Sequence, residues 1–114
     1  MSNPSKRKGT EWESRCRDYL RDLYPLVERS PAWGAGDKGD LTGTGMFTVE
    51  CKATKSIDLA GFVDEAVTEA RNVGPLQLPV ALVKRRNKSV HDGYAVMPMW
   101  AWKRLVQLIE ESHA

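Results

Sequence analysis

The sequence predicts one α/β domain in which helices cover a mixed β-sheet. Three observations lead to this prediction. Apolar residues recur at helical spacing in three segments, one near each end of the chain and one in its middle. Shorter runs between them alternate or are continuously apolar, as strands do. Pro and Gly fall between the periodic segments, and 114 residues suit a single compact domain.

The first helix is expected from about Glu11 to Tyr24, after a flexible basic arm at residues 1–9, so that the domain proper is residues 10–114. Thr10 is a natural N-cap, and Pro25 would stop the helix. The residues that form its apolar stripe are Trp12, Cys16, Tyr19, Leu20 and Leu23.

Short extended pieces are expected at residues 26–29 and near Leu41, followed by a longer strand at residues 47–53. This strand alternates with the two-residue period of a half-buried strand, which gives each of its faces its own set of side chains. One set, expected on the core face, is Phe47, Val49 and Cys51, and the other is Thr48, Glu50 and Lys52.

A second helix is expected at residues 58–73, with Asp58 as its cap and Gly74-Pro75 as its stop. A continuously apolar, buried strand follows at residues 78–83, and a shorter strand at residues 94–97. The last helix starts near Pro98. The side chains that it is expected to turn inward are Trp102, Leu105, Val106 and Ile109. The predicted order is therefore α, β, β, β, α, β, β, α.

Composition favours a soluble, cytoplasmic protein. The chain has two cysteines at unrelated positions, no apolar run near the ~20 residues of a membrane span, and no apolar stretch behind its basic N-terminus. The net charge is only +2, but the basic residues fall in two clusters. These clusters would either flank a phosphate backbone or be solvated ends of elements. They are Lys6, Arg7 and Lys8 in the first, and Lys84, Arg85, Arg86 and Lys88 in the second.

Glu50 and Lys52 lie two apart on the 47–53 strand and must project from the same face. Asp40 lies before a glycine-containing turn that leads into this strand. If the turn is a three-residue loop at residues 44–46, Asp40 lies opposite Glu50, with Cβ atoms about 4.5–5.5 Å apart. A register slip of one residue would move Asp40 to the other face.

Two carboxylates so close together repel each other, and a divalent cation would relieve the repulsion. Oxygen ligands favour Mg²⁺, with Mn²⁺ tolerated, because neither His91 nor His113 is near this set in sequence. The ammonium of Lys52 would orient the attacking water or neutralise the developing charge. The pattern therefore predicts metal-dependent phosphodiester hydrolysis, with no further small-molecule cofactor.

Asp40 followed by Glu50-Cys51-Lys52 resembles the signature of PD-(D/E)XK nucleases, with Gly39 where the family name has proline. Lys8-Gly9-Thr10 followed by Glu13 is similar to the first-helix opening of archaeal and phage Holliday junction resolvases. The glycine-rich segment at residues 32–41 also resembles their approach to the aspartate. The similarity covers roughly residues 8–86.

This resemblance implies a restriction-endonuclease-like fold in which Glu13, Asp40 and Glu50 bind the metal and Lys52 is catalytic. It also implies a homodimer that binds branched DNA, the four-way junction above all. The small size resembles that of phage-encoded members, which would act in the cytoplasm of the host cell. The alternatives are a nuclease with another DNA substrate (restriction-type, flap or single-strand) and a DNA-binding module of the same fold that does not cleave.

Several individual residues have a second interpretation. Glu13 would also complete a capping box with Thr10. Asp37 competes with Asp40 as the metal ligand, and Ser30 is a further polar candidate near the site. Trp33 is the tryptophan expected to contact DNA. The residues expected to fill the core instead are Cys16, Cys51, Trp12 and Trp102.

Overall fold

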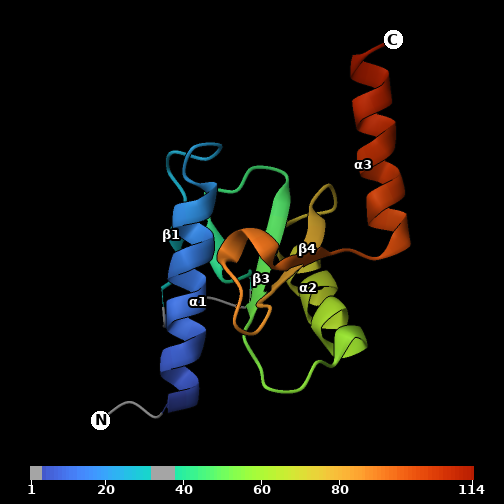
Figure 1. The fold of residues 1–114 in the computed structure, drawn as a ribbon. Coiled ribbons are helices and arrows are strands. Elements are labelled where there is room, and N and C mark those ends of the chain that lie inside the picture. The colour runs from blue at the N-terminus through green and yellow to red at the C-terminus, as the bar shows by residue number, and fades with distance from the viewer. Residues whose placement is uncertain (1–3, 32–37) are drawn as a thin grey trace.

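The structure is a computed structural model that describes residues 4–31 and 38–114. Its α/β class agrees with the prediction (Figure 1). Along the chain come α1 (Pro4–Leu20), β1 (Glu28–Arg29), β2 (Leu41–Thr42), β3 (Phe47–Lys52), α2 (Leu59–Val73), β4 (Leu78–Val83), the short 3₁₀ helix η1 (Val90–Asp92), β5 (Tyr94–Val96) and α3 (Met99–Ser112).

Within residues 4–31 and 38–114 the strands form two sheets, whereas the sequence suggested one. The central sheet has the order β3-β4-β5, with β3 and β4 parallel and β5 antiparallel to β4. The strands β1 and β2 form a separate antiparallel pair, in which Glu28 lies opposite Thr42. The crossover between the parallel strands runs through α2, as parallel pairing requires.

The central sheet is covered on both faces, with α1 on one side and α2 on the other (Figure 1). The indole of Trp12 donates a hydrogen bond to the carbonyl of Leu82, 2.9 Å away, and so joins α1 to β4. The main core, between α1 and the sheet, consists of Trp12, Cys16, Val27, Leu41, Val49, Cys51 and Val80. The smaller core under α2 consists of Phe62, Ala81 and Val83.

Both ends of α1 differ from the prediction. The helix starts at Pro4, so residues 4–9, expected to belong to a flexible arm, are helical. Proline is favoured at a first helical position, and the Lys-Arg-Lys run that follows consists of good helix formers. Thr10 therefore lies inside the helix and is not its N-cap. The helix ends at Leu20, whose carbonyl accepts a hydrogen bond from the N–H of Tyr24 at 2.8 Å.

The last helix, α3, stands away from the rest of the molecule (Figure 1). Its first turn packs on the body, since Ala101 is fully buried. Trp102 and Ile109, expected to point inward, are 58% and 47% exposed. That expectation was wrong because most of α3 extends past the three-stranded sheet and has no surface to cover. Over residues 4–31 and 38–114, no helix has both the length and the apolar character needed to cross a membrane.

Candidate functional site

Asp40 is held against β3 by hydrogen bonds on both of its sides. Its backbone N–H donates to the carbonyl of Val49 at 2.7 Å, and its Oδ2 accepts from the N–H of Cys51 at 2.8 Å. On the other side, the N–H of Ser30 donates to the carbonyl of Asp40, and the Ser30 hydroxyl donates to the carbonyl of Gly39, both at 2.8 Å. Ser30 thus positions the backbone of Asp40.

The expected register between Asp40 and β3 was wrong by one residue. The backbone bond between Asp40 and Val49 sets Asp40 opposite Val49, where the turn prediction had Glu50. The carboxylates of Asp40 and Glu50 are neighbours all the same, and their repulsion contributes to the raised pKa of Glu50. This is because Asp40 precedes β2, so no strand ladder dictates the face on which its side chain lies.

Glu50 is deeply buried, with 5% of its surface exposed. It lies on the α2 face of β3, and its Oε2 is buried without a hydrogen-bond donor in the described part of the chain. Burial, followed by the carboxylates of Glu69 and Asp40, raises the pKa of Glu50 to about 11. In the absence of a cation, Glu50 is therefore protonated at neutral pH.

Lys52 lies on the same face as Glu50, as predicted. Its ammonium contacts Oε2 of Glu65, lies 3.4 Å from Oε1 of Glu50, and sits 5.6 Å from the centre of the Phe62 ring. Burial lowers the pKa of Lys52, but the interactions with Glu65 and Glu50 outweigh it and raise the pKa above its usual value. The side chain is thus a fixed positive charge and is unsuited to act as a base.

Two acids of this site were missed in the sequence. Glu65 and Glu69 project from α2, and their carboxylate oxygens lie with that of Glu50 within 4.8 Å of one another. The sequence carried a signal for them, because they are four apart and Glu69 falls within the apolar stripe of Phe62, Ala66 and Ala70. A charged residue in such a stripe is rarely buried without a charged or polar neighbour.

Glu13 lies on α1 near Asp40 and is half-buried. Its carboxylate accepts a hydrogen bond from Nε of Arg29 at 3.2 Å. Burial and the negative charge of Asp40 raise the pKa of Glu13, and Arg29 partly offsets them. The capping-box alternative is wrong, because α1 starts six residues before Thr10. Glu13 is a neighbour of Asp40, and Asp40 is a neighbour of Glu50. Among the described residues, however, the three acids whose carboxylate oxygens all lie within 4.8 Å of one another are Glu50, Glu65 and Glu69.

A basic groove of about 650 Å³ adjoins this acidic site. It opens at the carboxyl ends of the parallel strands β3 and β4, where ligands commonly bind in α/β sheets. The N–H of Lys84 donates to the carbonyl of Lys52 at 2.8 Å, so the groove begins directly beside Lys52. Its lining residues are Lys8, Ala53, Thr54, Lys55, Ile57, Lys84, Arg85, Arg86 and Tyr94.

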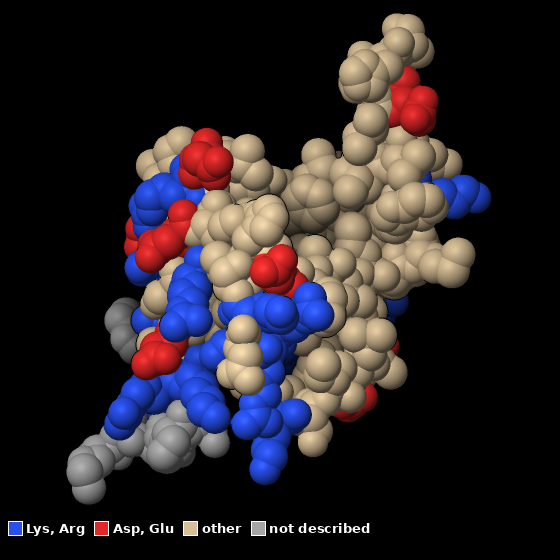
Figure 2. Space-filling view, in the orientation of Figure 1, with Lys and Arg blue, Asp and Glu red and all other residues tan. Residues whose placement is uncertain are grey.

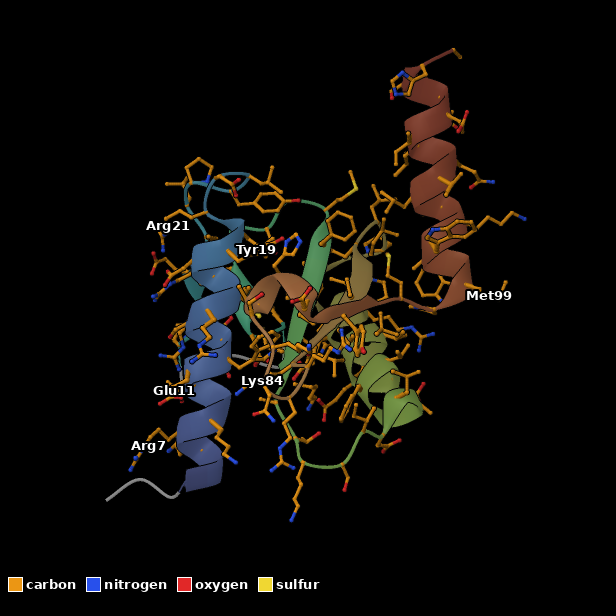
Figure 3. All side chains as sticks on the ribbon, in the orientation of Figure 1. Arg7, Glu11, Tyr19, Arg21, Lys84 and Met99 are labelled. Atoms are coloured by element: carbon orange, nitrogen blue, oxygen red, sulfur yellow. The ribbon has the colours of Figure 1, made fainter. Side chains whose placement is uncertain are left out.

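The groove gathers four of the basic residues expected to bind DNA (Lys8, Lys84, Arg85 and Arg86) and adds Lys55. Lysine and arginine side chains crowd the lower part of the molecule in Figure 2. Lys6, Arg7 and Lys88 are not among the lining residues, and Arg7 points outward from α1, away from the sheet (Figure 3). Trp33 and Asp37 lie outside the described residues.

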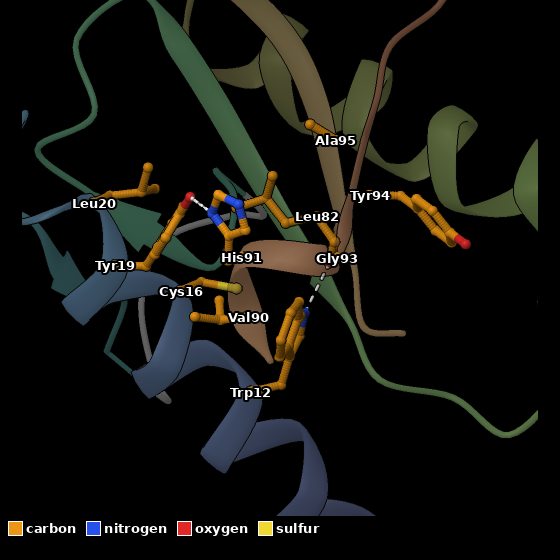
Figure 4. A pocket seen from close by; sticks show the side chains of 10 residues that line it. All are labelled: Trp12, Cys16, Tyr19, Leu20, Leu82, Val90, His91, Gly93, Tyr94 and Ala95. Atoms are coloured by element: carbon orange, nitrogen blue, oxygen red, sulfur yellow. Dashed lines mark hydrogen bonds between the residues drawn. The ribbon is translucent and has the colours of Figure 1, made fainter. Parts of the chain in front are cut away.

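A second, apolar groove of about 280 Å³ lies on the α1 face of the sheet, next to η1 (Figure 4). Among its lining side chains, the hydroxyl of Tyr19 and Nδ1 of His91 form a hydrogen bond of 2.9 Å. Leu82 and Ala95 line it from the sheet, and they face away from the side that carries Glu50 and Lys52. This groove is therefore separate from the acidic site.

The two cysteines fill the core, as predicted. Cys16 and Cys51 are buried and do not form a disulfide. The contact with Cys16, together with burial, raises the pKa of the Cys51 thiol. A thiol with a raised pKa is a poor nucleophile and a poor metal ligand, so the chemistry of the site lies with its carboxylates and its lysine.

Comparisons with known proteins gave no match for this chain among family models, curated proteins or solved structures. The chemistry of the acidic site and its basic groove is therefore the basis for a functional proposal.

Proposed function

We propose that this chain is a Mg²⁺-dependent endonuclease of the PD-(D/E)XK type, with a restriction-endonuclease-like fold, that cleaves branched DNA. The four-way junction is the substrate we favour. The observation that supports this proposal is the position of Asp40, Glu50 and Lys52 beside a groove lined by five cationic side chains. Acids that bind a metal and cations that bind phosphates are both needed for phosphodiester hydrolysis.

The residues fit a divalent cation. Oε2 of Glu50 is buried and receives no hydrogen bond from any described residue, and the neighbouring groups of Glu69 and Asp40 are carboxylates. A cation would satisfy this oxygen and relieve the repulsion. Because the available ligands are oxygens, Mg²⁺ is the preferred ion, and Mn²⁺ would be tolerated. Asp40 and Glu50 would hold the ion, with Glu13 as the third ligand candidate.

Lys52 and the groove have separate tasks in this proposal. When bound, the ion would polarise the scissile phosphate and acidify a water molecule. The protonated Lys52 neutralises negative charge that develops on the phosphate oxygens. The cations of the groove hold neighbouring phosphates without reading the base sequence, so the DNA is selected by its shape.

We also propose a homodimer in which α3 pairs with α3 of a second copy. Met99, Trp102, Val106 and Ile109 follow one another at spacings of three, four and three, which is the seam of a helix pair. Met99, Trp102 and Ile109 are 84%, 58% and 47% exposed. An apolar seam on a projecting helix favours a partner helix, because a helix of 14 residues is marginal in water by itself.

The charges of α3 favour a second copy in antiparallel orientation as that partner. Its first half carries Lys103 and Arg104, and its second half carries Glu110 and Glu111. Two antiparallel copies would therefore place the basic half of each helix beside the acidic half of the other. The resulting two-fold symmetry would match that of a four-way junction.

The proposal is tested by cleavage of a labelled four-way junction, with linear, nicked, flapped and single-stranded DNA as companions, in Mg²⁺, Mn²⁺ or EDTA. Glu50→Gln and Lys52→Ala are compared with Asp64→Asn, which alters an exposed acid of α2. We expect Mg²⁺-dependent cutting of the junction, with at least about 100-fold loss in the two site variants and none in the control.

Other results would change the assignment. Junction binding without cutting in either metal would indicate a DNA-binding module. Equal cutting of linear duplex would indicate a restriction-type nuclease, and preferred cutting of flaps or single strands would indicate a nuclease of that kind. Cutting that persists in Glu50→Gln would refute the proposed site.

A further inference from the structure

Tyr94 shares a row of the central sheet with Lys52. Lys52 pairs with Val83 on β4, and Val83 pairs with Tyr94 on β5. Residues that pair across a sheet project from the same face, so the side chains of Lys52 and Tyr94 lie on one face. Two strand spacings separate them, which is about 10 Å between their backbones. Tyr94 therefore belongs to the neighbourhood of the acidic site.

The part of the groove around Tyr94 is not purely basic. Tyr94 is 47% exposed, and Ile57, which also lines the groove, is 57% exposed. The guanidinium of Arg85 lies 5.8 Å from the centre of the Tyr94 ring. The hydroxyl of Tyr94 can donate to a phosphate, but the face of its ring and the aliphatic side chain of Ile57 have no group that binds one. They would add affinity for a nucleotide whose base is accessible.

Bases in an uninterrupted duplex expose only their edges, because their faces are stacked on neighbouring pairs. The face of an aromatic ring can contact a base face only where a nucleotide is unpaired or unstacked. Single strands, flaps and imperfectly paired branch points contain such nucleotides. The groove thus combines phosphate contacts with a surface that fits an unpaired base.

We propose that Tyr94 stacks on an unpaired base of the DNA strand that passes Lys52, while the surrounding cations hold the phosphates of that strand. The inference rests on the proposed function and narrows its substrate class to branched DNA with unpaired nucleotides beside the scissile phosphate. Arg85, placed over the tyrosine ring, serves as a positioning residue that keeps the ring in the groove.

The test measures DNA binding in EDTA by fluorescence anisotropy, so that no cleavage is needed. The probes are a single strand, a four-way junction with unpaired nucleotides at its branch, and an uninterrupted duplex. The variants are Tyr94→Leu, which removes the ring, and Tyr94→Phe, which keeps it. Tyr19→Leu is the matched control, because Tyr19 is 48% exposed and lines the apolar groove but, unlike Tyr94, not the basic one. Circular dichroism verifies that each variant is folded.

We expect Tyr94→Leu to bind the single strand and the unpaired junction about tenfold more weakly, and to bind the duplex almost unchanged. Tyr94→Phe and Tyr19→Leu should bind all three probes as the unmodified chain does. The inference would be overturned if Tyr94→Leu lost affinity equally for duplex and single strand, or lost affinity for neither. It would also be overturned if the unmodified chain bound none of the three probes.

The same variants separate this inference from the proposed function. Selective loss of single-strand binding in Tyr94→Leu, in a chain that cuts no DNA, would support the stacking role and reject the nuclease. Metal-dependent cutting by the unmodified chain, together with no selective loss of single-strand binding in Tyr94→Leu, would support the nuclease and reject the stacking role.

Discussion

The carboxylate of Asp40 accepts a hydrogen bond from the backbone N–H of Cys51 at 2.8 Å. Cys51 lies between Glu50 and Lys52 on β3, so this bond attaches Asp40 to the strand that carries the other two residues of the proposed site. The carboxylate thus has a structural task in the apo protein as well as the proposed task of binding a metal.

These two tasks of Asp40 can be separated by substitution. Asp40→Asn keeps an oxygen that accepts the Cys51 hydrogen bond but removes the charge, so cleavage should fall at least about 100-fold with little change in stability. Asp40→Ala removes the acceptor as well and should lower the free energy of unfolding by about 1–3 kcal/mol. Denaturant unfolding and junction cleavage measure the two effects. Normal cutting by Asp40→Asn would exclude Asp40 as a ligand.

The backbone just before Asp40 depends on glycine. Gly39 has φ of +94°, and a Cβ at this position would lie 2.9 Å from the carbonyl oxygen of Val49. We expect Gly39→Ala to lower the free energy of unfolding by about 1–3 kcal/mol and to reduce cleavage, because Asp40 must shift. Gly9→Ala is the contrasting variant, since Gly9 lies inside α1 with open space around it. It should raise stability by about 0.5–1 kcal/mol in the same unfolding assay, and similar effects of the two changes would contradict this account.

The protonation of Glu50 should make the apo protein less stable as the pH rises. Burial, then the carboxylates of Glu69 and Asp40, raise its folded pKa to about 11, against about 4.3 in the unfolded chain. Between these values the folded state binds more protons than the unfolded state, so the free energy of unfolding falls with pH. One extra proton bound by the folded state lowers the free energy of unfolding by at most ~1.4 kcal/mol for each unit by which the pH rises.

This contribution is isolated by comparing Glu50→Gln with the unmodified protein in EDTA from pH 6 to pH 9. The variant has no proton to lose at this position, so its stability should depend less on pH and exceed that of the unmodified protein at pH 8 and above. Asp64→Asn should keep the slope of the unmodified protein. Parallel curves for Glu50→Gln and the unmodified protein would show that Glu50 does not titrate as described.

What the sequence predicted correctly was local. The shared face of Glu50 and Lys52 followed from the two-residue alternation of β3, which holds in any strand. The position of Asp40 was predicted less well. It depends on the positive φ of Gly39 and on the hydrogen bond from the N–H of Cys51 to the Asp40 carboxylate, which attaches Asp40 to β3 where no strand ladder does. Turn length alone contains neither piece of information.

The features that were missed depend on how distant elements pack. Glu65 and Glu69 reach Glu50 because α2 crosses over the face of β3, and sequence spacing does not say which strand residues a helix will meet. The exposure of Trp102 has a similar cause. Helical periodicity shows that α3 has an apolar face, but the pattern is the same whether that face covers its own sheet or another chain.

If the apolar face of α3 pairs with a second copy, a charge on the seam should dissociate the dimer. We expect Trp102→Glu to shift the chain from dimer to monomer in sedimentation velocity experiments, because the charge would have to be buried between the helices. Gln107→Glu adds the same charge to the exposed, polar side of α3 and should leave the dimer intact. A chain that is monomeric at all concentrations up to about 100 μM, at which even weak pairing is detected, would rule out the pairing.

The antiparallel orientation can be tested by exchanging charges. Lys103→Glu alone would place acids beside Glu110 and Glu111 of the second copy, twice in a two-fold dimer, and should weaken dimerisation by up to about tenfold. Glu110→Lys alone should weaken it in the same way through repulsion between bases. The double variant restores opposite charges across an antiparallel pair, so its dissociation constant should return toward that of the unmodified chain, and the effect should diminish at high salt. In a parallel pair, residue 103 of one helix would lie about 10 Å along the axis from residue 110 of the other. The double variant would then restore no attraction, and the absence of rescue would therefore reject the antiparallel arrangement.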